Sequence, residues 1–532
     1  MKTQTTLGHP SNSKPLALGS SSSKRFSLFA LCVLLAFTGC GQREEVRFGA
    51  KNFPESQTLA EMLWHISTAH GVDAPAPKQL GDTPIVWNAL LQGEIDAYVD
   101  YTGTIREETL RAENLTTDED VRAALAERGI LMSESLGFNN TYAIGMLESE
   151  AARLGITKIS DLAQHPELKL GFSTAFVDRP DCWPALKSVY GLPHANVRSM
   201  DHALTYEALE TGDISVLDLY STDAELASDK YRRLEDDQQV FPEYNSVLLY
   251  RQDFSERHPT VVQELLKLQG RISEEEMQQL NTKVKTNNED PSRVAGDYIA
   301  AEFPDWQPRL QRQVAGREKS LIERVGHNTL EHLFLVGVSL FAAVLIGLPA
   351  GIVSARYQRV GQAVLAATGI VQTIPSLALL VMLMVPLSYL QITSIGAVPA
   401  ILALFLYSLL PIVRNTVTGL QSISPAINES AAALGLSAID RLRLVELPLA
   451  SRTIMAGIKT AAVINVGFAT LGALIGAGGY GQPIMQGIAS QNYALIMEGA
   501  LAAAGLAIFV QLLFEWLELF VVPRGLRVTA VK

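Results

Sequence analysis

The chain has 532 residues, more than one hydrophobic core usually serves, so at least two domains are expected. The net charge is −12, and residues 321–532 hold only 11 Lys and Arg and 8 Asp and Glu, so the acidic excess lies in residues 1–320. This division indicates a soluble acidic part joined to an apolar membrane part. The lack of a basic or aromatic-basic tract argues against nucleic-acid binding.

The N-terminal segment has the pattern of an export signal. Lys24 and Arg25 precede the apolar run 26–37, which has the length of a signal-peptide core and is short for a membrane span. The run ends in Phe-Thr-Gly-Cys, which resembles a lipoprotein cleavage box with Cys40 as the lipidated residue. We expect a signal peptide over 1–40, and the residues leave open whether Cys40 is lipidated.

Short strand-like and helix-like segments alternate from Val46 to about Pro308. The expected strands include 46–50, 97–101, 141–146, 169–172 and 215–220, and the expected helices include 55–70 and 85–92. Alternation of this kind predicts an α/β architecture with a parallel or mixed sheet, in a segment long enough for two lobes. We therefore expect an α/β domain over 46–310 and a polar linker over 311–326.

Apolar segments long enough to cross a bilayer follow this linker. The five segments are 327–353, 361–386, 395–413, 454–476 and 495–522. Prolines inside them, such as Pro375, are tolerated where neighbouring helices satisfy the backbone. We therefore expect a membrane domain over 327–525.

The distribution of basic residues predicts the orientation of these spans. With the α/β domain outside, Arg356, Arg414 and Arg524 fall on the cytoplasmic side, and the outer loops 387–394 and 477–494 contain no Lys or Arg. This is the bias of cell-membrane proteins, in which positive residues stay inside. A multi-pass protein of the cell (inner) membrane is predicted, with its N-terminal domain extracytoplasmic.

The cytoplasmic loop 415–453 carries the strongest motif. It reads Glu429-Ser-Ala-Ala-Ala-Leu-Gly435, then nine residues, then Val445-Glu-Leu447-Pro448. The small residues allow a short helix to approach a partner closely, and Gly435 favours a turn after it. The motif resembles the coupling (EAA) loop of ABC-importer permeases, which implies ATPase-coupling roles for Glu429, Ala431, Ala432, Gly435, Leu447 and Pro448. No G-x-x-x-x-G-K-[ST] sequence occurs, so the ATPase is expected on a separate subunit.

Both halves of the chain resemble one family, the ABC importers of quaternary-amine osmoprotectants such as glycine betaine, choline and carnitine. In the membrane half the resemblance covers nearly all of 321–525 and is carried by Gln372-Thr-Ile-Pro-Ser-Leu377, by 404–418 and by Ile475-Gly-Ala-Gly-Gly-Tyr-Gly481. In the N-terminal half eight short pieces resemble the substrate-binding proteins of that family. They are, in order, Lys51–Glu55, Gly93–Asp96, Asp100–Thr104, Gly137–Tyr142, Ile159–Leu162, Tyr220–Asp223, Leu234–Asp237 and Phe241–Tyr244.

The resemblance implies two folds in one chain. The N-terminal half is expected to have the two-lobed periplasmic-binding-protein fold of type II, with crossovers between the lobes near 138–146 and 244–250. The C-terminal half is expected to be an all-α permease of the MetI-like kind with about five transmembrane helices. The segment Arg179-Pro-Asp-Cys-Trp183 stands where Arg-x-Asp-Gly-Tyr is more usual, and this leaves the exact ligand open.

Candidate ligand residues follow from the chemistry of a trimethylammonium group, which cannot donate hydrogen bonds. Aromatic faces attract its charge by roughly 0.5–2 kcal/mol per contact. The candidates are Tyr101, Tyr142, Tyr206, Tyr220 and Tyr244 as aromatic faces; Lys51, Asn140, Thr141, Thr222 and Arg179 as donors to a ligand carboxylate; and Asp82 or Asp100 as a source of negative potential. The alternative for each Tyr is a core position, and the alternative for Arg179 is a structural ion pair.

The sequence thus predicts that the chain captures a small cationic or zwitterionic solute and passes it through the membrane, with ATP hydrolysed by a cytoplasmic ABC ATPase. Two copies are expected to line one pathway in membrane lipid, and no cofactor, metal or nucleic acid is expected. The alternative solute is another trimethylated amino-acid derivative such as ergothioneine. The alternative class is a membrane-anchored ligand sensor, and an enzyme is not expected because the sequence has no metal cluster, triad or phosphate loop.

Overall fold

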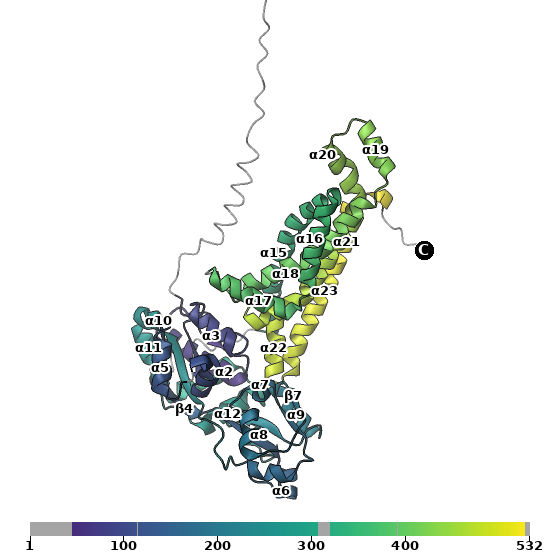
Figure 1. Cartoon of the computed structure of the whole chain (residues 1–532). Coiled ribbons are helices and arrows are strands. Elements are labelled where there is room, and N and C mark those ends of the chain that lie inside the picture. Colours follow the sequence, from purple (N-terminus) through teal and green to yellow (C-terminus); the bar gives the residue numbers. More distant parts are fainter. Residues whose placement is uncertain (1–44, 114, 307–319, 391, 527–532) are drawn as a thin grey trace, which may run out of the picture. The chain divides into compact units, whose positions relative to one another are not determined.

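A computed structural model describes residues 45–113, 115–306, 320–390 and 392–526. The expected signal peptide with Cys40, and most of the expected linker, lie outside these residues. The described chain forms an α/β domain up to Trp306 and a helical domain from Leu321 onward, coloured from purple to teal and from teal to yellow in Figure 1.

The first lobe of the α/β domain is built on five strands in the order β2-β1-β3-β10-β4. These are β1 (Gly49–Ala50), β2 (Lys78–Gln79), β3 (Ala97–Tyr101), β4 (Ile130–Asn139) and β10 (Asn245–Arg251). A parallel bridge from Phe48 to Ala97 joins β1 to β3, and β10 runs antiparallel between β3 and β4. The helices of this lobe include α2 (Pro54–Ala69), α3 (Thr83–Leu91), α5 (Asp118–Ala126), α10 (Gln252–Arg257), α11 (Pro259–Leu265) and α13 (Pro291–Glu302). All five residues of β3 are buried, as expected for a strand covered on both faces.

The second lobe repeats this plan with the strand order β7-β6-β8-β5-β9. The strands are β5 (Tyr142–Leu147), β6 (Leu170–Ser173), β7 (Val197–Met200), β8 (Leu217–Tyr220) and β9 (Tyr231–Arg233), and a parallel bridge from Leu170 to Val216 joins the two sets. Its helices are α6 (Glu148–Leu154), α7 (Thr174–Asp178), α8 (Trp183–Tyr190) and α9 (His202–Glu210).

The chain crosses between the lobes twice, at 140–141 and just before Asn245, so the expected crossovers are confirmed. Helix α12 (Glu274–Lys285) contacts both α2 and the 3-10 turn Ala224–Ala227 of the second lobe. Strands β1, β3, β6 and β8 each end at a cavity. Ligands of α/β proteins bind outside the carboxyl ends of such strands, so this topology places the candidate site there.

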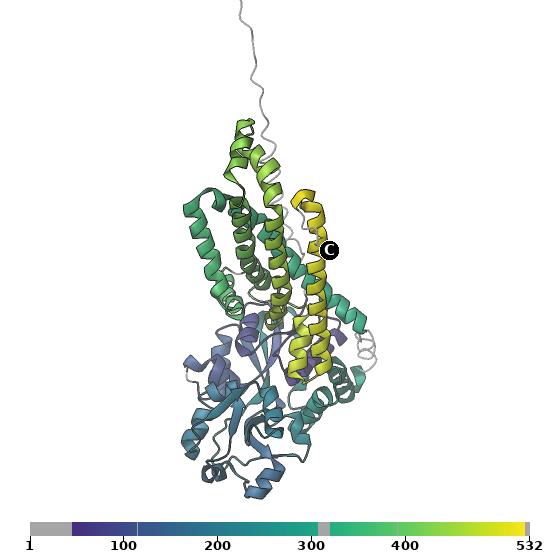
Figure 2. The same cartoon turned by 90° about the vertical axis from the view of Figure 1, so that its right-hand side faces the viewer.

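The helical domain consists of long apolar helices, most of which lie side by side in both views, whereas the helix Ser376–Tyr389 turns away from the others (Figures 1 and 2). They are α15 (Leu321–Arg356), α16 (Gln358–Thr373), α17 (Ser376–Tyr389), α18 (Ala397–Gln421), α21 (Leu447–Ala469) and α23 (Tyr493–Val521), with the shorter α19 (Pro425–Ala433), α20 (Ala438–Arg441) and α22 (Gly481–Ala489) between them. Four helices in the described residues are long and apolar enough to cross a membrane, or up to five if the bent pair α16–α17 is one span.

Two boundaries differ from the sequence expectations. Helix α15 begins at Leu321, inside the expected linker, because Ser320 and Glu323 form a reciprocal capping box there. The expected span 361–386 is not one straight helix, because α16 and α17 meet at 105°. The cause is Pro375, since the residue before a proline is disfavoured in helical geometry and Ile374 is extended (φ −71°, ψ 126°).

Candidate functional site

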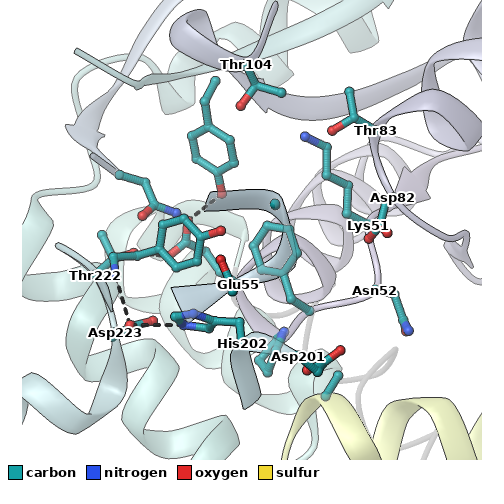
Figure 3. A pocket seen from close by; sticks show the side chains of 18 of the residues that line it. Lys51, Asn52, Glu55, Asp82, Thr83, Thr104, Asp201, His202, Thr222 and Asp223 are labelled. Carbon is teal, nitrogen blue, oxygen red and sulfur yellow. Dashed lines mark hydrogen bonds and ion pairs between the residues drawn. The ribbon is translucent and has the colours of Figure 1, made fainter. Parts of the chain in front are cut away.

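A cavity of about 430 Å³ lies between the two lobes of the α/β domain. Figure 3 shows Lys51 and Asp82 on one side of it and His202, Thr222 and Asp223 across from them. The first pair comes from the first lobe and the other three from the second, so both lobes form the wall.

Four of the five predicted tyrosines line this cavity, and three of them form one cluster. Tyr142 begins β5 and Tyr220 ends β8, and the antiparallel register places them opposite each other. Their ring centroids are 4.8 Å apart, and the Tyr220 hydroxyl donates to the Tyr142 hydroxyl at 3.1 Å. The Tyr244 ring stands edge-on to Tyr142, with centroids 5.6 Å apart at 86°. This tyrosine cluster of Tyr142, Tyr220 and Tyr244 presents aromatic faces and hydroxyls to one cavity.

The other two predicted tyrosines have different surroundings. Tyr101 lines the cavity, and its hydroxyl donates to Glu55 at 2.5 Å. Tyr206 is not among the cavity-lining residues; its ring packs on Tyr231 with centroids 5.3 Å apart, and its hydroxyl donates to Asp223 at 2.7 Å. The core alternative therefore describes the position of Tyr206.

Glu55 is a cavity residue that the sequence motifs contained but did not single out. One carboxylate oxygen accepts from Tyr101 and, at 2.8 Å, from Asn140; the other accepts from Thr222 at 2.6 Å and Asn281 at 2.8 Å. Burial raises the pKa of the Glu55 carboxyl, and the hydrogen bonds from Thr222 and Tyr101 offset only part of this effect. The donors come from the first lobe, a crossover, the second lobe and α12, so this carboxyl ties the hinge region together.

The predicted donors are mostly engaged with protein groups. Lys51 pairs with Asp100 at 2.5 Å, and Asn140 donates to Glu55. The Thr141 hydroxyl donates to a backbone carbonyl at 3.0 Å, and Thr141 is not among the lining residues. Lys51, Asn140, Thr222 and Arg179 line the cavity, as does Asp82; Asp100 is fully buried behind Lys51.

His202 is a further lining residue that no motif indicated. Its Nε2 lies 3.2 Å from Asp223 and its Nδ1 lies 3.7 Å from Asp218. Burial alone lowers the pKa of His202, but the charges of Asp223 and Asp218 outweigh it and raise the pKa from 6.5 to about 10. His202 is therefore a cation at neutral pH, with its ring centroid 4.7 Å from that of Tyr220. No sequence motif could indicate His202, because Asp218 and His202 lie on different elements and come together only in the folded domain.

The predicted coupling loop has a helix followed by a turn. Pro425 starts α19 in the favoured first-turn position, and Gly435 adopts φ +81° just beyond the helix. Glu429 and Ala432 are exposed on this helix, whereas Ala431 is buried. The Leu434 side chain is 82% exposed, which is unfavourable for an apolar group in water. This end of the loop therefore presents an unpartnered apolar surface.

An ionic junction joins this loop to the first long helix. Glu446, just before Leu447 and Pro448, accepts from Arg356 at 2.6 Å and from Arg441 at 3.2 Å. Arg356 ends α15 and Arg441 ends α20, so one nearly buried carboxylate holds together the C-terminal end of α15 and the segment after α19. No motif indicated this role for Glu446.

Comparison with known families assigns the two halves separately. Residues 44–301 match the family described as the substrate binding domain of ABC-type glycine betaine transport system. Residues 347–526 match the family described as binding-protein-dependent transport system inner membrane component. The family boundaries thus follow the division between the α/β domain and the helical domain.

Individual relatives match the helical half. The osmoprotectant import permease protein OsmW of Salmonella typhimurium is 42% identical over 199 residues, which is 37% of this chain and 92% of that protein. The choline transport system permease protein OpuBD of Bacillus subtilis is 43% identical over 202 residues, 38% of this chain and 87% of that protein. For the other half, a crystal structure described as a glycine betaine/carnitine/choline ABC transporter is 29% identical with a TM-score of 0.42, over 48% of this chain and 99% of that chain.

Proposed function

We propose that the chain captures quaternary-amine compatible solutes and moves them across the membrane. The chain belongs to the family of osmoprotectant ABC importers, and it carries their substrate-binding domain and permease in one polypeptide. The solute class is glycine betaine, choline and carnitine. The chain supplies binding and passage, and ATP hydrolysis is supplied by a separate ABC ATPase.

The tyrosine cluster is the observation that carries this proposal. A trimethylammonium group spreads its charge over methyl groups, so it binds best where aromatic faces replace hydrogen-bond acceptors, at up to about 2 kcal/mol per desolvated contact. At the cavity between the lobes, the ring centroids of Tyr220 and Tyr244 lie 4.8 Å and 5.6 Å from that of Tyr142, so three such faces gather there. A primary ammonium would instead need hydrogen-bond acceptors, which aromatic faces do not provide.

The coupling loop supports the ATPase partner. A short helix with small exposed residues and an apolar tip at Leu434 suits insertion into a groove on a cytoplasmic subunit. The ionic junction at Glu446 then connects that helix to the inner end of α15. In this arrangement the α/β domain is extracytoplasmic, two copies of the helical domain line one pathway in the lipid bilayer, and Cys40 is the site of lipid attachment.

The test is ATP-dependent uptake by the full chain reconstituted with a cognate ABC ATPase in proteoliposomes. Glycine betaine, choline and carnitine are offered separately, with ergothioneine and proline as comparison solutes. Uptake of at least one of the first three, abolished when ATP is replaced by a non-hydrolysable analogue, is the expected result. Uptake of ergothioneine alone would overturn the solute assignment, and the absence of ATP-dependent uptake of every solute would overturn the transport function.

A further inference from the structure

The motif Gly93-Glu-Ile-Asp96 of the first lobe is not part of the solute site, because none of its four residues is among those that line the cavity. Gly93 turns the chain after α3 with φ +70°. Ile95 is fully buried in the core, and the Asp96 carboxylate accepts from a backbone N–H of the same lobe at 2.8 Å. These three positions serve the fold of the first lobe, whereas Glu94 has its partners outside that lobe.

Glu94 binds the start of a permease helix. Its carboxylate accepts from the backbone N–H of Ser394 at 2.6 Å and from that of Ile395 at 3.3 Å, and both residues come just before α18. The N-terminus of a helix carries a partial positive charge, so a carboxylate beside it is stabilised. Glu94 is only 7% exposed, and solvent therefore screens this attraction little.

Neighbouring hydrogen bonds widen the contact between the first lobe and the permease. The side-chain amide of Gln92 donates to the hydroxyl of Ser388, near the C-terminal end of α17, at 2.7 Å. The backbone N–H of Gly81 donates to the carbonyl of Leu474 at 3.0 Å. The first lobe thus meets the permease at two turns that are far apart in the sequence, one before α18 and one after α21.

An apolar contact lies beside these hydrogen bonds. Leu80 of the first lobe is 1% exposed, Ile475 of the permease is fully buried, and both belong to one hydrophobic cluster. Gly476 follows with φ +72°, and a Cβ atom there would lie 2.7 Å from Leu80, so only glycine permits this approach. The Ile475 carbonyl also accepts from the N–H of Gly396, the N-cap of α18, at 2.6 Å. One turn therefore touches both the first lobe and the start of α18.

We infer that the motif Gly93–Asp96 is a docking element, which seats the first lobe on the permease half of the same chain with Glu94 as its anchor at the start of α18. This inference rests on the proposed function. Helix α18 has 25 residues, so it is about 37 Å long, and it ends at Gln421 inside the predicted coupling loop 415–453. One continuous helix connects the docking anchor to the loop that the proposed function assigns to the ATPase.

A residue that only stabilised the first lobe would behave differently from a docking anchor. If Glu94 served the fold of the lobe alone, its loss would weaken solute binding and transport together. A docking anchor acts on the lobe that has already bound solute. Its loss therefore leaves the solute affinity nearly unchanged and lowers the ATP hydrolysis that solute stimulates.

The first test compares Glu94→Gln with the wild type, with glycine betaine, choline and carnitine as probes. The amide keeps the shape of the side chain and removes its charge, so solute-stimulated ATP hydrolysis by the full chain with its ATPase should fall about tenfold. Calorimetry of the full chain in nanodiscs should give the wild-type dissociation constant. The matched control is Glu134→Gln, because Glu134 lies in the same lobe and is 74% exposed, and it should match the wild type in both assays. An equal loss of affinity, or unchanged ATP hydrolysis, overturns the anchor.

The second test probes the docking surface without the ATPase and remains decisive if Glu94→Gln does not fold. Gln92→Cys combined with Ser388→Cys should be joined by a short bismaleimide within one chain, detected as linked peptides by mass spectrometry. Gln92→Cys alone is the control, and the native Cys182 is buried. The absence of a link overturns the inference, as does a link formed only between co-expressed chains that carry one cysteine each. If the wild type takes up no solute, the proposed function fails, and the cross-link still decides whether the lobe docks here.

Discussion

His202 provides a sharp test of the electrostatics of the second lobe. His202 is the first residue of α9. Its Nε2 lies 3.2 Å from the carboxylate of Asp223, and its Nδ1 lies 3.7 Å from that of Asp218, which is fully buried. Because these two carboxylates raise the pKa of His202 from 6.5 to about 10 against the effect of burial, the folded state holds a proton that the unfolded chain releases near neutral pH. His202→Gln removes this charge while keeping a polar side chain of similar reach.

The size of the effect follows from that pKa. A rise from 6.5 to about 10 corresponds to about 5 kcal/mol at about 1.4 kcal/mol per pKa unit. The side chain is 23% exposed, and solvent screening lowers the expected contribution to about 3 kcal/mol. Since the pKa is raised in the folded state, the stabilisation is complete below pH 6.5, declines as the pH rises, and is gone above about 10.

Hydrogen exchange of the full chain in nanodiscs measures this directly, because amides of β5 and β8 report the local opening free energy. The wild type should exceed His202→Gln by about 3 kcal/mol near pH 6.5, and the difference should shrink toward zero by about pH 10. His165→Gln is the matched control, since His165 lies in the same lobe beside the exposed Glu167 at 3.0 Å. A difference independent of pH, or equal in the control, would refute the electrostatic reasoning.

Three further substitutions test other contacts. Glu55→Gln should lower the local stability of β3 by about 1–3 kcal/mol, because an amide NH2 group would replace one carboxylate oxygen and face the groups that donate to it. Because the pKa of the Glu55 carboxyl is raised above 4.5, the wild type should also gain stability as the pH falls toward 4.5, and parallel hydrogen-exchange profiles for the two proteins would contradict this. Gly103→Ala would place a methyl group 2.5 Å from the Tyr244 ring, so glycine betaine should bind roughly tenfold more weakly by calorimetry; an unchanged affinity would mean that the ring position does not matter. Glu446→Gln should leave ATP hydrolysis in place and reduce the solute moved per ATP severalfold, because Arg356 is no longer tied to the coupling loop; an unaltered ratio in proteoliposomes would rule the junction out.

Local sequence patterns were sufficient for most of the α/β elements. The strand expected at 97–101 is β3 with the same bounds, and the helix expected at 55–70 is α2 shifted by one residue. Strand and helix periods are local properties, so they can be read without knowing the tertiary fold. The pairing of Tyr142 with Tyr220 is not local, and the motifs indicated both residues without indicating that they meet.

Residues whose role depends on distant partners were the ones missed. The oxygens of Glu55 accept from side chains up to 226 positions away, and no spacing rule connects such positions. His202 lacks a motif for the same reason. The break at Pro375 was visible in the sequence but was read as tolerated within a continuous span, since hydropathy does not report backbone direction.

The bend between α16 and α17 imposes a requirement on its neighbour. Hydrocarbon offers the backbone no hydrogen-bond partner, so carbonyls released where a helix opens must be served by protein. The Tyr407 hydroxyl of α18 donates to the carbonyl of Ile374, and Gln372 Nε2 donates back to the Tyr407 carbonyl at 3.0 Å. α18 therefore supplies the hydrogen bonds that water would otherwise provide at the bend. If α18 moved without the bend, the Ile374 carbonyl would lose its hydrogen-bond donor in the lipid.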